Sequence, residues 1–151
     1  MTEHIDDADD DVMLVDEGLE ILSEDECWRL IEMPGIGRVG VTVGALPAIF
    51  PVNYAVSDRT IVFRTADGTK LRAAVEHAVV VFEVDHADPL YHDGWSVQVV
   101  GVAEPVEHDD DPARHAAVAP WASGDRSNYV RIRPEMVSGR RISREGRATS
   151  A

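Results

Sequence analysis

Seven short runs rich in β-branched and aromatic residues, separated by turn signals, constrain this chain more than any other feature. The runs occupy residues 38–43, 48–56, 61–65, 79–85, 95–106, 128–133 and 136–143. Helical periodicity is confined to three short segments, at residues 24–33, 69–77 and 109–119. Because strands and helices do not alternate regularly, the pattern predicts a mostly antiparallel sheet closed into a barrel and argues against a doubly wound parallel sheet.

The length and composition predict one domain flanked by polar ends. The chain has 151 residues, of which 44% are hydrophobic, and this is enough to build a single core. Residues 1–17 hold eight acidic side chains and no basic one, which predicts a disordered acidic tail. The folded domain is expected over residues 18–143, and residues 144–151 are expected to fray.

Charge and cysteine usage exclude several classes of protein. A formal charge of -14 disfavours nucleic acid, whose phosphates would be repelled. The single cysteine, Cys27, excludes an internal disulfide and a cysteine-rich zinc site. The acidic start is unlike a signal peptide, and no apolar run approaches the roughly 20 residues of a membrane span. We therefore expect a cytoplasmic protein that contacts no membrane.

The first helix has a recognisable start and stop. Ser23 and Glu26 have the spacing of a capping box, and Pro34 ends the helical pattern. Cys27 falls on the apolar face of this helix, so we expect it to be inert core and not a nucleophile. Trp28 and Trp121 are expected to pack and not to form ligand platforms.

One strand-to-helix junction has the composition of an anion site. Arg64 and Lys70 bracket the loop Asp67-Gly68-Thr69, which leads directly into the second helix. Backbone N–H groups at a helix start, the Thr69 hydroxyl and two cationic side chains could converge on one phosphate. The alternative is that both cations are surface charges beside a tight turn, and the longer glycine-rich phosphate loop is absent.

Other kinds of chemistry have weaker signals. The two histidines His86 and His92, with Asp85, Asp88 and Asp93, form the one cluster that suggests a metal. A segment of this composition is usually a solvated turn, so no metal site is predicted. Acidic pairs elsewhere fall in loops or helix caps, so no carboxylate acid–base pair and no catalytic residue is assigned.

The order of several motifs resembles a known family. Along the chain stand G-R-V-G-V-T, P-V-N-Y, F-R-T-x-x-G-T-K-L, F-E-V-D and W-S-V-x-V-x-G-x-A. Over residues 22–105 this order is similar to the pyridoxamine 5'-phosphate oxidase-like group of flavin-binding split-barrel proteins. The resemblance implies a six-stranded antiparallel split β-barrel with short flanking helices, assembled as a homodimer with two flavin sites at the interface.

The resemblance also implies which residues hold the cofactor. The phosphate would be held by Arg64, Thr65, Gly68, Thr69 and Lys70. The ring system would lie along Pro51, Val52, Asn53 and Tyr54, with Trp95 and Ser96 near it. For Tyr54 and Trp95, ordinary packing in the barrel is the alternative. FMN is the expected cofactor, and a deazaflavin coenzyme is the alternative.

Departures from the oxidase proper change the expected activity. The C-terminal Trp, Arg and His set that reads the substrate phosphate is missing at residues 137–143, and Leu71 replaces a second basic residue after Lys70. The chain is closer to a short branch with nitroimidazole-reductase-like and deazaflavin-binding members. We expect a flavin-dependent oxidoreductase that reduces a small, planar, electron-poor molecule, with broad specificity and without a strong anion-binding group. The alternatives are a non-catalytic flavin carrier or sensor, and a cofactor-free barrel that serves as a partner surface.

Overall fold

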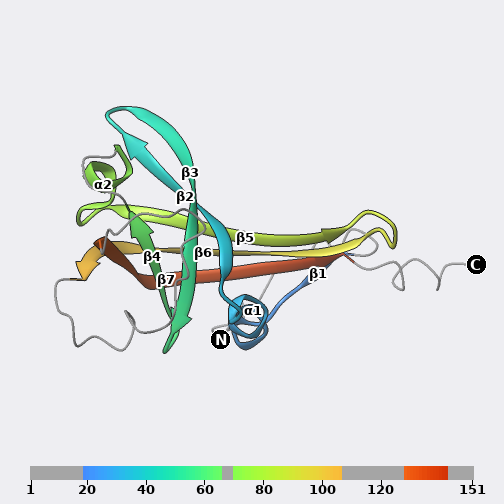
Figure 1. Ribbon diagram of the computed structural model, residues 1–151. Coiled ribbons are helices and arrows are strands. Elements are labelled where there is room, and N and C mark those ends of the chain that lie inside the picture. Colours follow the sequence, from blue (N-terminus) through green and yellow to red (C-terminus); the bar gives the residue numbers. More distant parts are fainter. Residues whose placement is uncertain (1–18, 66–69, 107–127, 143–151) are drawn as a thin grey trace, which may run out of the picture.

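The computed structural model describes residues 19–65, 70–106 and 128–142, and within them the chain forms two helices and seven strands (Figure 1). The helices are α1 (Glu24–Ile31) and α2 (Lys70–Val75). The strands are β1 (Leu19–Ile21), β2 (Gly35–Val43), β3 (Leu46–Ser57), β4 (Thr60–Thr65), β5 (Val79–Asp88), β6 (Asp93–Val106) and β7 (Asn128–Ile142). The mostly β, antiparallel architecture predicted from the sequence is confirmed. The predicted helix at 109–119 and both predicted tails lie outside the described residues.

Six of the strands close into a ring. The sheet runs in the order β7-β4-β3-β2-β5-β6, and β6 pairs in turn with β7. Every pairing is antiparallel, but β2 meets β5 only where Arg38–Gly40 lies opposite Val81–Glu83. Beyond this short contact the two strands separate, so the barrel is split. The six-stranded split barrel is therefore as predicted, while β1, which pairs with the end of β7, was not predicted.

The last strand corrects one prediction. The sequence suggested separate strands at 128–133 and 136–143. Pro134, which lies between them, has no backbone N–H to donate. Instead β7 is continuous, and the register against β6 shifts between the pairs Gly101–Pro134 and Val100–Met136. The shift leaves Glu135 as an extra residue in β7, which makes a β-bulge at which a proline is tolerated.

The β5–β6 hairpin is also longer than predicted. The segment 86–94 was expected to be a solvated turn, but β5 continues to Asp88 and β6 begins at Asp93. One carboxylate oxygen of Asp88 accepts hydrogen bonds from the backbone N–H groups of Leu90 at 2.9 Å and Tyr91 at 3.3 Å. This side chain stabilises the tight turn, which allows the strands to pair almost to their ends.

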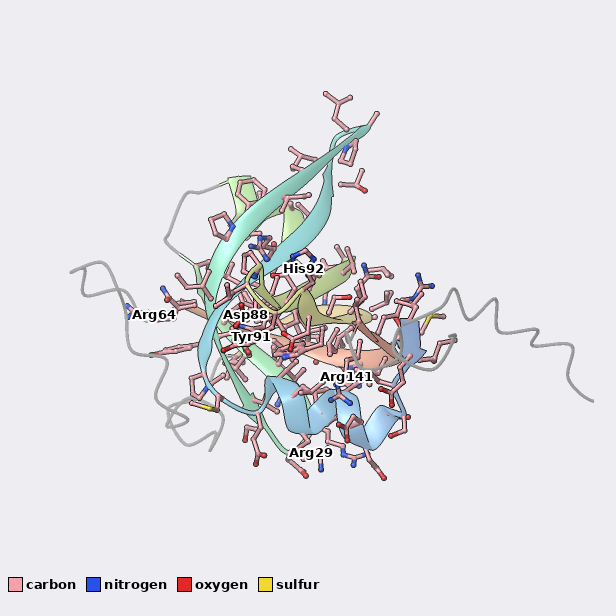
Figure 2. All side chains as sticks on the ribbon, turned by 90° about the vertical axis from the view of Figure 1, so that its right-hand side faces the viewer. Arg29, Arg64, Asp88, Tyr91, His92 and Arg141 are labelled. Atoms are coloured by element: carbon pink, nitrogen blue, oxygen red, sulfur yellow. The ribbon has the colours of Figure 1, made fainter. Side chains whose placement is uncertain are left out.

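Helix α1 is positioned by a cap and by an ion pair. The Ser23 hydroxyl accepts a hydrogen bond from the Glu26 backbone N–H at 3.2 Å, as the capping-box spacing predicted. The helix ends at Ile31 and buries Cys27. Arg141 of β7 donates to the Glu26 carboxylate at 2.8 Å, and this hydrogen bond holds the pKa of Glu26 below its usual value. The helix is thereby tied to the end of the last strand (Figure 2).

The core fills the inside of the barrel. Its largest fully buried side chains include Phe63, Phe82, Ile31, Ile61 and Ile132. Leu71 and Val75 of α2 are buried in the same cluster, as is the expected packing residue Trp28. Among the described residues, no helix is both long and apolar enough to cross a membrane.

Candidate functional site

The end of β4 carries two of the predicted phosphate-binding residues. Thr65 is 5% exposed, and no hydrogen-bond partner for its hydroxyl is found within the described residues. The Arg64 side chain lies on the opposite face of the strand, with its guanidinium 5.9 Å from the centre of the Tyr129 ring. Lys70 follows at the first position of α2, while Gly68 and Thr69 lie outside the described residues.

Strand β3 brings Asn53 to the same outer face as Arg64. Asn53 lies opposite Ile36 of β2, one residue beyond the pair formed by Tyr54 and Phe63 on β4. Its side chain is half-buried, and its Oδ1 atom has no partner among the residues that the structure describes. An unpaired buried oxygen costs free energy unless a ligand or water satisfies it. This end of the sheet therefore has unused hydrogen-bonding capacity on both of its faces.

Tyr54 is surrounded by core residues and by the end of α1. Its one hydroxyl proton is shared between the backbone carbonyl oxygens of Ile31 at 3.2 Å and Met33 at 3.0 Å. Its ring meets that of Phe82 edge-on, with centroids 4.9 Å apart, and burial raises the pKa of the phenol. The side chain thus packs in the core, which is the alternative that the sequence left open. Beside it on β3, Val52 is buried and Pro51 is exposed.

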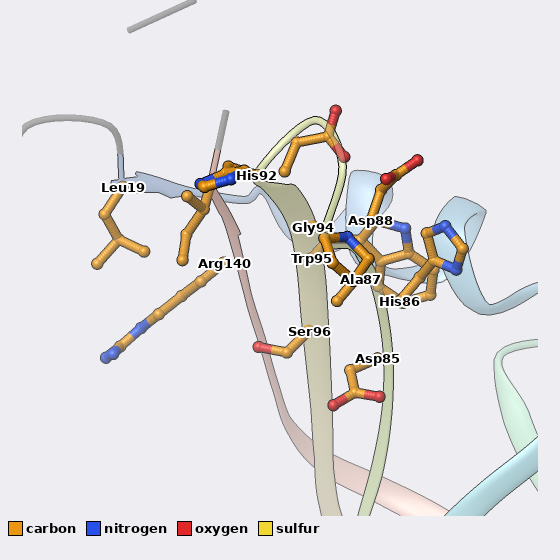
Figure 3. A pocket seen from close by; sticks show the side chains of 13 residues that line it. Leu19, Asp85, His86, Ala87, Asp88, His92, Gly94, Trp95, Ser96 and Arg140 are labelled. Carbon is orange, nitrogen blue, oxygen red and sulfur yellow. The ribbon is translucent and has the colours of Figure 1, made fainter. Parts of the chain in front are cut away.

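A pocket lies at the far end of the barrel, where the β5–β6 hairpin meets the ends of β1 and β7 (Figure 3). We call it the hairpin pocket, and its volume is about 640 Å³. It is lined by Leu19, Asp85, His86, Ala87, Asp88, Pro89, His92, Asp93, Gly94, Trp95, Ser96, Arg140 and Ile142. A volume of this size suits a small organic molecule.

Trp95 and Ser96 line this pocket from opposite faces of β6. Trp95 is half-buried and packs against the core, with its ring 6.5 Å from that of His86 on the neighbouring strand. Ser96 lies opposite Arg140 on β7 and opposite Asp85 on β5, so these three side chains share the outer face. Figure 3 shows the Ser96 hydroxyl on the side of β6 that faces Arg140.

The predicted site residues therefore form two groups at opposite ends of the barrel. The group at the end of β4 lies beside α2, whereas Trp95 and Ser96 lie near the tip of the β5–β6 hairpin (Figure 1). Figure 2 looks onto that tip and shows Arg64 well to one side of it. One copy of the chain does not bring the two groups together.

The histidine and aspartate cluster at the hairpin does not make a metal centre in the part of the chain that the structure describes. No group of three or more His, Cys, Asp or Glu side chains with suitable placement is found there. One Asp88 oxygen is used to cap the turn, and Asp85 accepts a hydrogen bond from Arg38 at 3.4 Å.

Arg140 is a candidate that the sequence did not single out. It follows Gly139 in a pair of arginines, and nothing in the sequence distinguishes it from Arg141. In the structure Arg141 binds Glu26 at 2.8 Å and lies 3.6 Å from Glu20, while Arg140 lines the hairpin pocket. The difference depends on which face of β7 each side chain occupies.

The fold is the split barrel of the flavin-binding proteins of this architecture. A model of the pyridoxamine 5'-phosphate oxidase family matches residues 23–141, so the chain belongs to that family. The predicted family resemblance is confirmed.

Relatives extend the comparison. An uncharacterized protein of Mycobacterium tuberculosis is 39% identical over 132 residues, which cover 83% of this chain and 87% of that protein. The structure of an FAD-binding protein from Mycobacterium smegmatis is 38% identical, covers 82% of this chain and 98% of that one, and has a TM-score of 0.67. An FAD-binding protein from Mesorhizobium loti is 27% identical, covers 83% and 99% of the two chains, and has a TM-score of 0.66.

Proposed function

We propose that the protein binds a flavin coenzyme between two copies of the chain. The phosphate would lie at the end of β4 in one copy, against Arg64, Thr65 and Lys70. The hairpin pocket of the partner subunit would supply Trp95 and Ser96. The observation that carries this proposal is the separation of the two groups within one chain. Across a two-fold axis, a contact between one group of the first copy and the other group of the second copy is repeated with the copies exchanged, so two complete sites form.

The residues at the end of β4 fit a phosphorylated ligand. The Thr65 hydroxyl and Asn53 Oδ1 have no partners within the described residues, and a bound molecule with donors and acceptors would satisfy both atoms. Arg64 adds a permanent positive charge on the outer face. In a chain with 28 acidic and 14 basic side chains, such a charge supports anion binding at this place.

The identity of the flavin is part of the proposal. The sequence favours FMN with a deazaflavin as the alternative, and the similar structures from M. smegmatis and M. loti are described as FAD-binding proteins. FAD was not among the sequence-based expectations. All three coenzymes share the phosphate that Arg64, Thr65 and Lys70 would hold, and comparing their affinities separates them.

The proposed activity is reduction of a small, electron-poor organic molecule. A bound flavin supplies the transfer of electrons or hydride, and the protein orients it and shapes the pocket. Ser96 offers a hydroxyl in the lining of the hairpin pocket, and Leu19 and Ile142 give the lining an apolar part. The alternative functions are a flavin carrier or sensor without turnover, and a cofactor-free barrel used as a partner surface.

Sharing of the site predicts complementation between two inactive variants. Lys70→Ala should weaken flavin binding at least about ten-fold through loss of a charge-assisted contact, and Ser96→Tyr should block the pocket. In a mixed dimer, one site carries both substitutions and the other carries neither. Half of the dimers that form at random from equal amounts of the two variants are mixed, so flavin fluorescence titration should recover about a quarter of the wild-type sites after the variants are refolded together.

Controls keep this result interpretable. Arg59→Ala removes a cation that pairs with Asp25 far from either group, so its flavin affinity should equal that of the wild type. Light scattering should give the mass of a dimer for every variant. A monomeric wild type, or mixed variants that recover no sites, would refute the shared site.

The proposed activity predicts faster oxidation of the reduced coenzyme when the protein is present. Under anaerobic conditions, protein loaded with reduced flavin is mixed with quinones, nitroaromatics or enones, and reoxidation is followed by absorbance. We expect rates above those of the free coenzyme for several of these molecules, because stacking and burial in a preformed pocket hold the reactants together. Equal rates with and without protein throughout would favour the carrier.

A further inference from the structure

Most arginine side chains in the part of the chain that the structure describes form ion pairs with nearby carboxylates. With net charge -14, an arginine seldom lies far from an acidic side chain. Within the described residues, ion pairs join Arg29 to Glu26, Arg38 to Glu83, Arg59 to Asp25, Arg133 to Glu104 and Arg141 to Glu26. Arg140 is different, because its side chain makes no hydrogen bond or ion pair with any residue that the structure describes.

Arg140 lies at the polar end of the hairpin pocket. The pair Ser96–Arg140 places the Cβ atoms of these two residues about 4.5–5.5 Å apart, and the Arg140 side chain extends from there on the side of Leu19. The pair Gly94–Ile142 is the next one on the same face, and Leu19 of β1 lies opposite Ile142. The pocket therefore has a cationic, hydrogen-bonding end at the pair Ser96–Arg140 (Figure 3). Its apolar end lies at the neighbouring pair Gly94–Ile142.

The carboxylates of the pocket are not placed to neutralise Arg140. Asp85 shares the outer face, but it accepts a hydrogen bond from Arg38 at 3.4 Å. Asp88 caps the turn, and the alternation of β6 turns Asp93 to the face opposite Ser96. The histidines His86 and His92 also line the pocket, and both side chains are exposed. The outer face thus offers Arg140 as a positive charge without a counter-ion among the described residues.

We infer that the hairpin pocket binds an anionic small molecule with a planar or apolar body. The carboxylate or phosphate of the ligand binds the Arg140 guanidinium and the Ser96 hydroxyl, and its body lies against Leu19, Ile142 and Gly94. The inference rests on the proposed function. It implies that the molecule reduced in the hairpin pocket is an aromatic acid. It replaces the sequence-based expectation of a pocket without a strong anion-binding group.

The test compares two probes of the same shape and different charge. The protein as isolated is titrated by calorimetry with 4-nitrobenzoate and with its neutral analogue 4-nitrobenzamide. We expect the wild type to bind the acid at least about ten-fold more tightly, as a charge-assisted hydrogen bond provides. Arg140→Gln should abolish this preference and leave binding of the amide unchanged, while Arg140→Lys should retain part of it.

A matched variant and a second titration complete the experiment. Arg133→Gln, on the same strand but bound to Glu104 at 2.9 Å, should keep the full preference for the acid.

The affinity of Arg140→Gln for flavin should equal that of the wild type. If Arg140→Gln instead loses flavin affinity, the anion at this residue is the phosphate of the coenzyme and the inference is overturned. It is overturned equally if the wild type does not prefer the acid. A preference for the acid in a protein that binds no flavin would uphold the pocket and refute the proposed function.

Discussion

Replacement of Phe82 by alanine is expected to lower the free energy of unfolding by about 3–5 kcal/mol. Phe82 lies on β5 with no exposed surface, and its ring meets that of Tyr54 at 4.9 Å. The Tyr54 hydroxyl in turn donates to backbone carbonyls at the end of α1 and just after it. Loss of the Phe82 ring leaves a cavity between β5, β3 and the end of this helix. Urea unfolding at one fixed protein concentration measures the effect.

Tyr91→Ala is the matched control for the Phe82 substitution. Tyr91 is also aromatic and lies in the same hairpin, but it is 60% exposed. Its truncation should change the unfolding free energy by no more than about 0.5 kcal/mol. A cost below about 1 kcal/mol for Phe82→Ala would mean that this ring does not fill the core as described.

Gly101→Ala is the second substitution with a large expected effect. A Cβ atom at Gly101 would lie 2.0 Å from the Arg133 carbonyl oxygen and 2.8 Å from its carbon, both of which belong to the backbone of β7. Neither atom is free to rotate away, so the bulge that accommodates Pro134 would have to open. We expect a loss of at least about 2 kcal/mol in the free energy of unfolding.

Gly35→Ala provides the same chemical change where there is room. A Cβ atom at Gly35 would have Cε1 of Tyr54 as its nearest neighbour, at the ordinary contact distance of 3.9 Å. This substitution should change stability by less than about 1 kcal/mol, in either direction. Equal midpoints in urea for the two alanine variants would contradict the tight approach of β6 and β7 at Gly101.

Local patterns in the sequence determined the class of fold. Runs of β-branched and aromatic residues between turn signals mark strands, so the runs at 48–56 and 61–65 correspond closely to β3 and β4. The cap at Ser23 depends on a bond that spans three residues, and it is present as predicted. The motif order from residue 22 onward was sufficient to predict the family.

Only the tertiary structure decided how the last strand pairs and what its arginines do. Pro134 is tolerated inside β7 because Glu135 forms a bulge against a distant strand, and no local signal contains that register. Arg140 and Arg141 are adjacent in sequence, but alternation directs Arg141 to Glu26 and leaves Arg140 in the hairpin pocket. Whether a charge is paired depends on contacts between residues more than a hundred positions apart, which the closure of the barrel brings together.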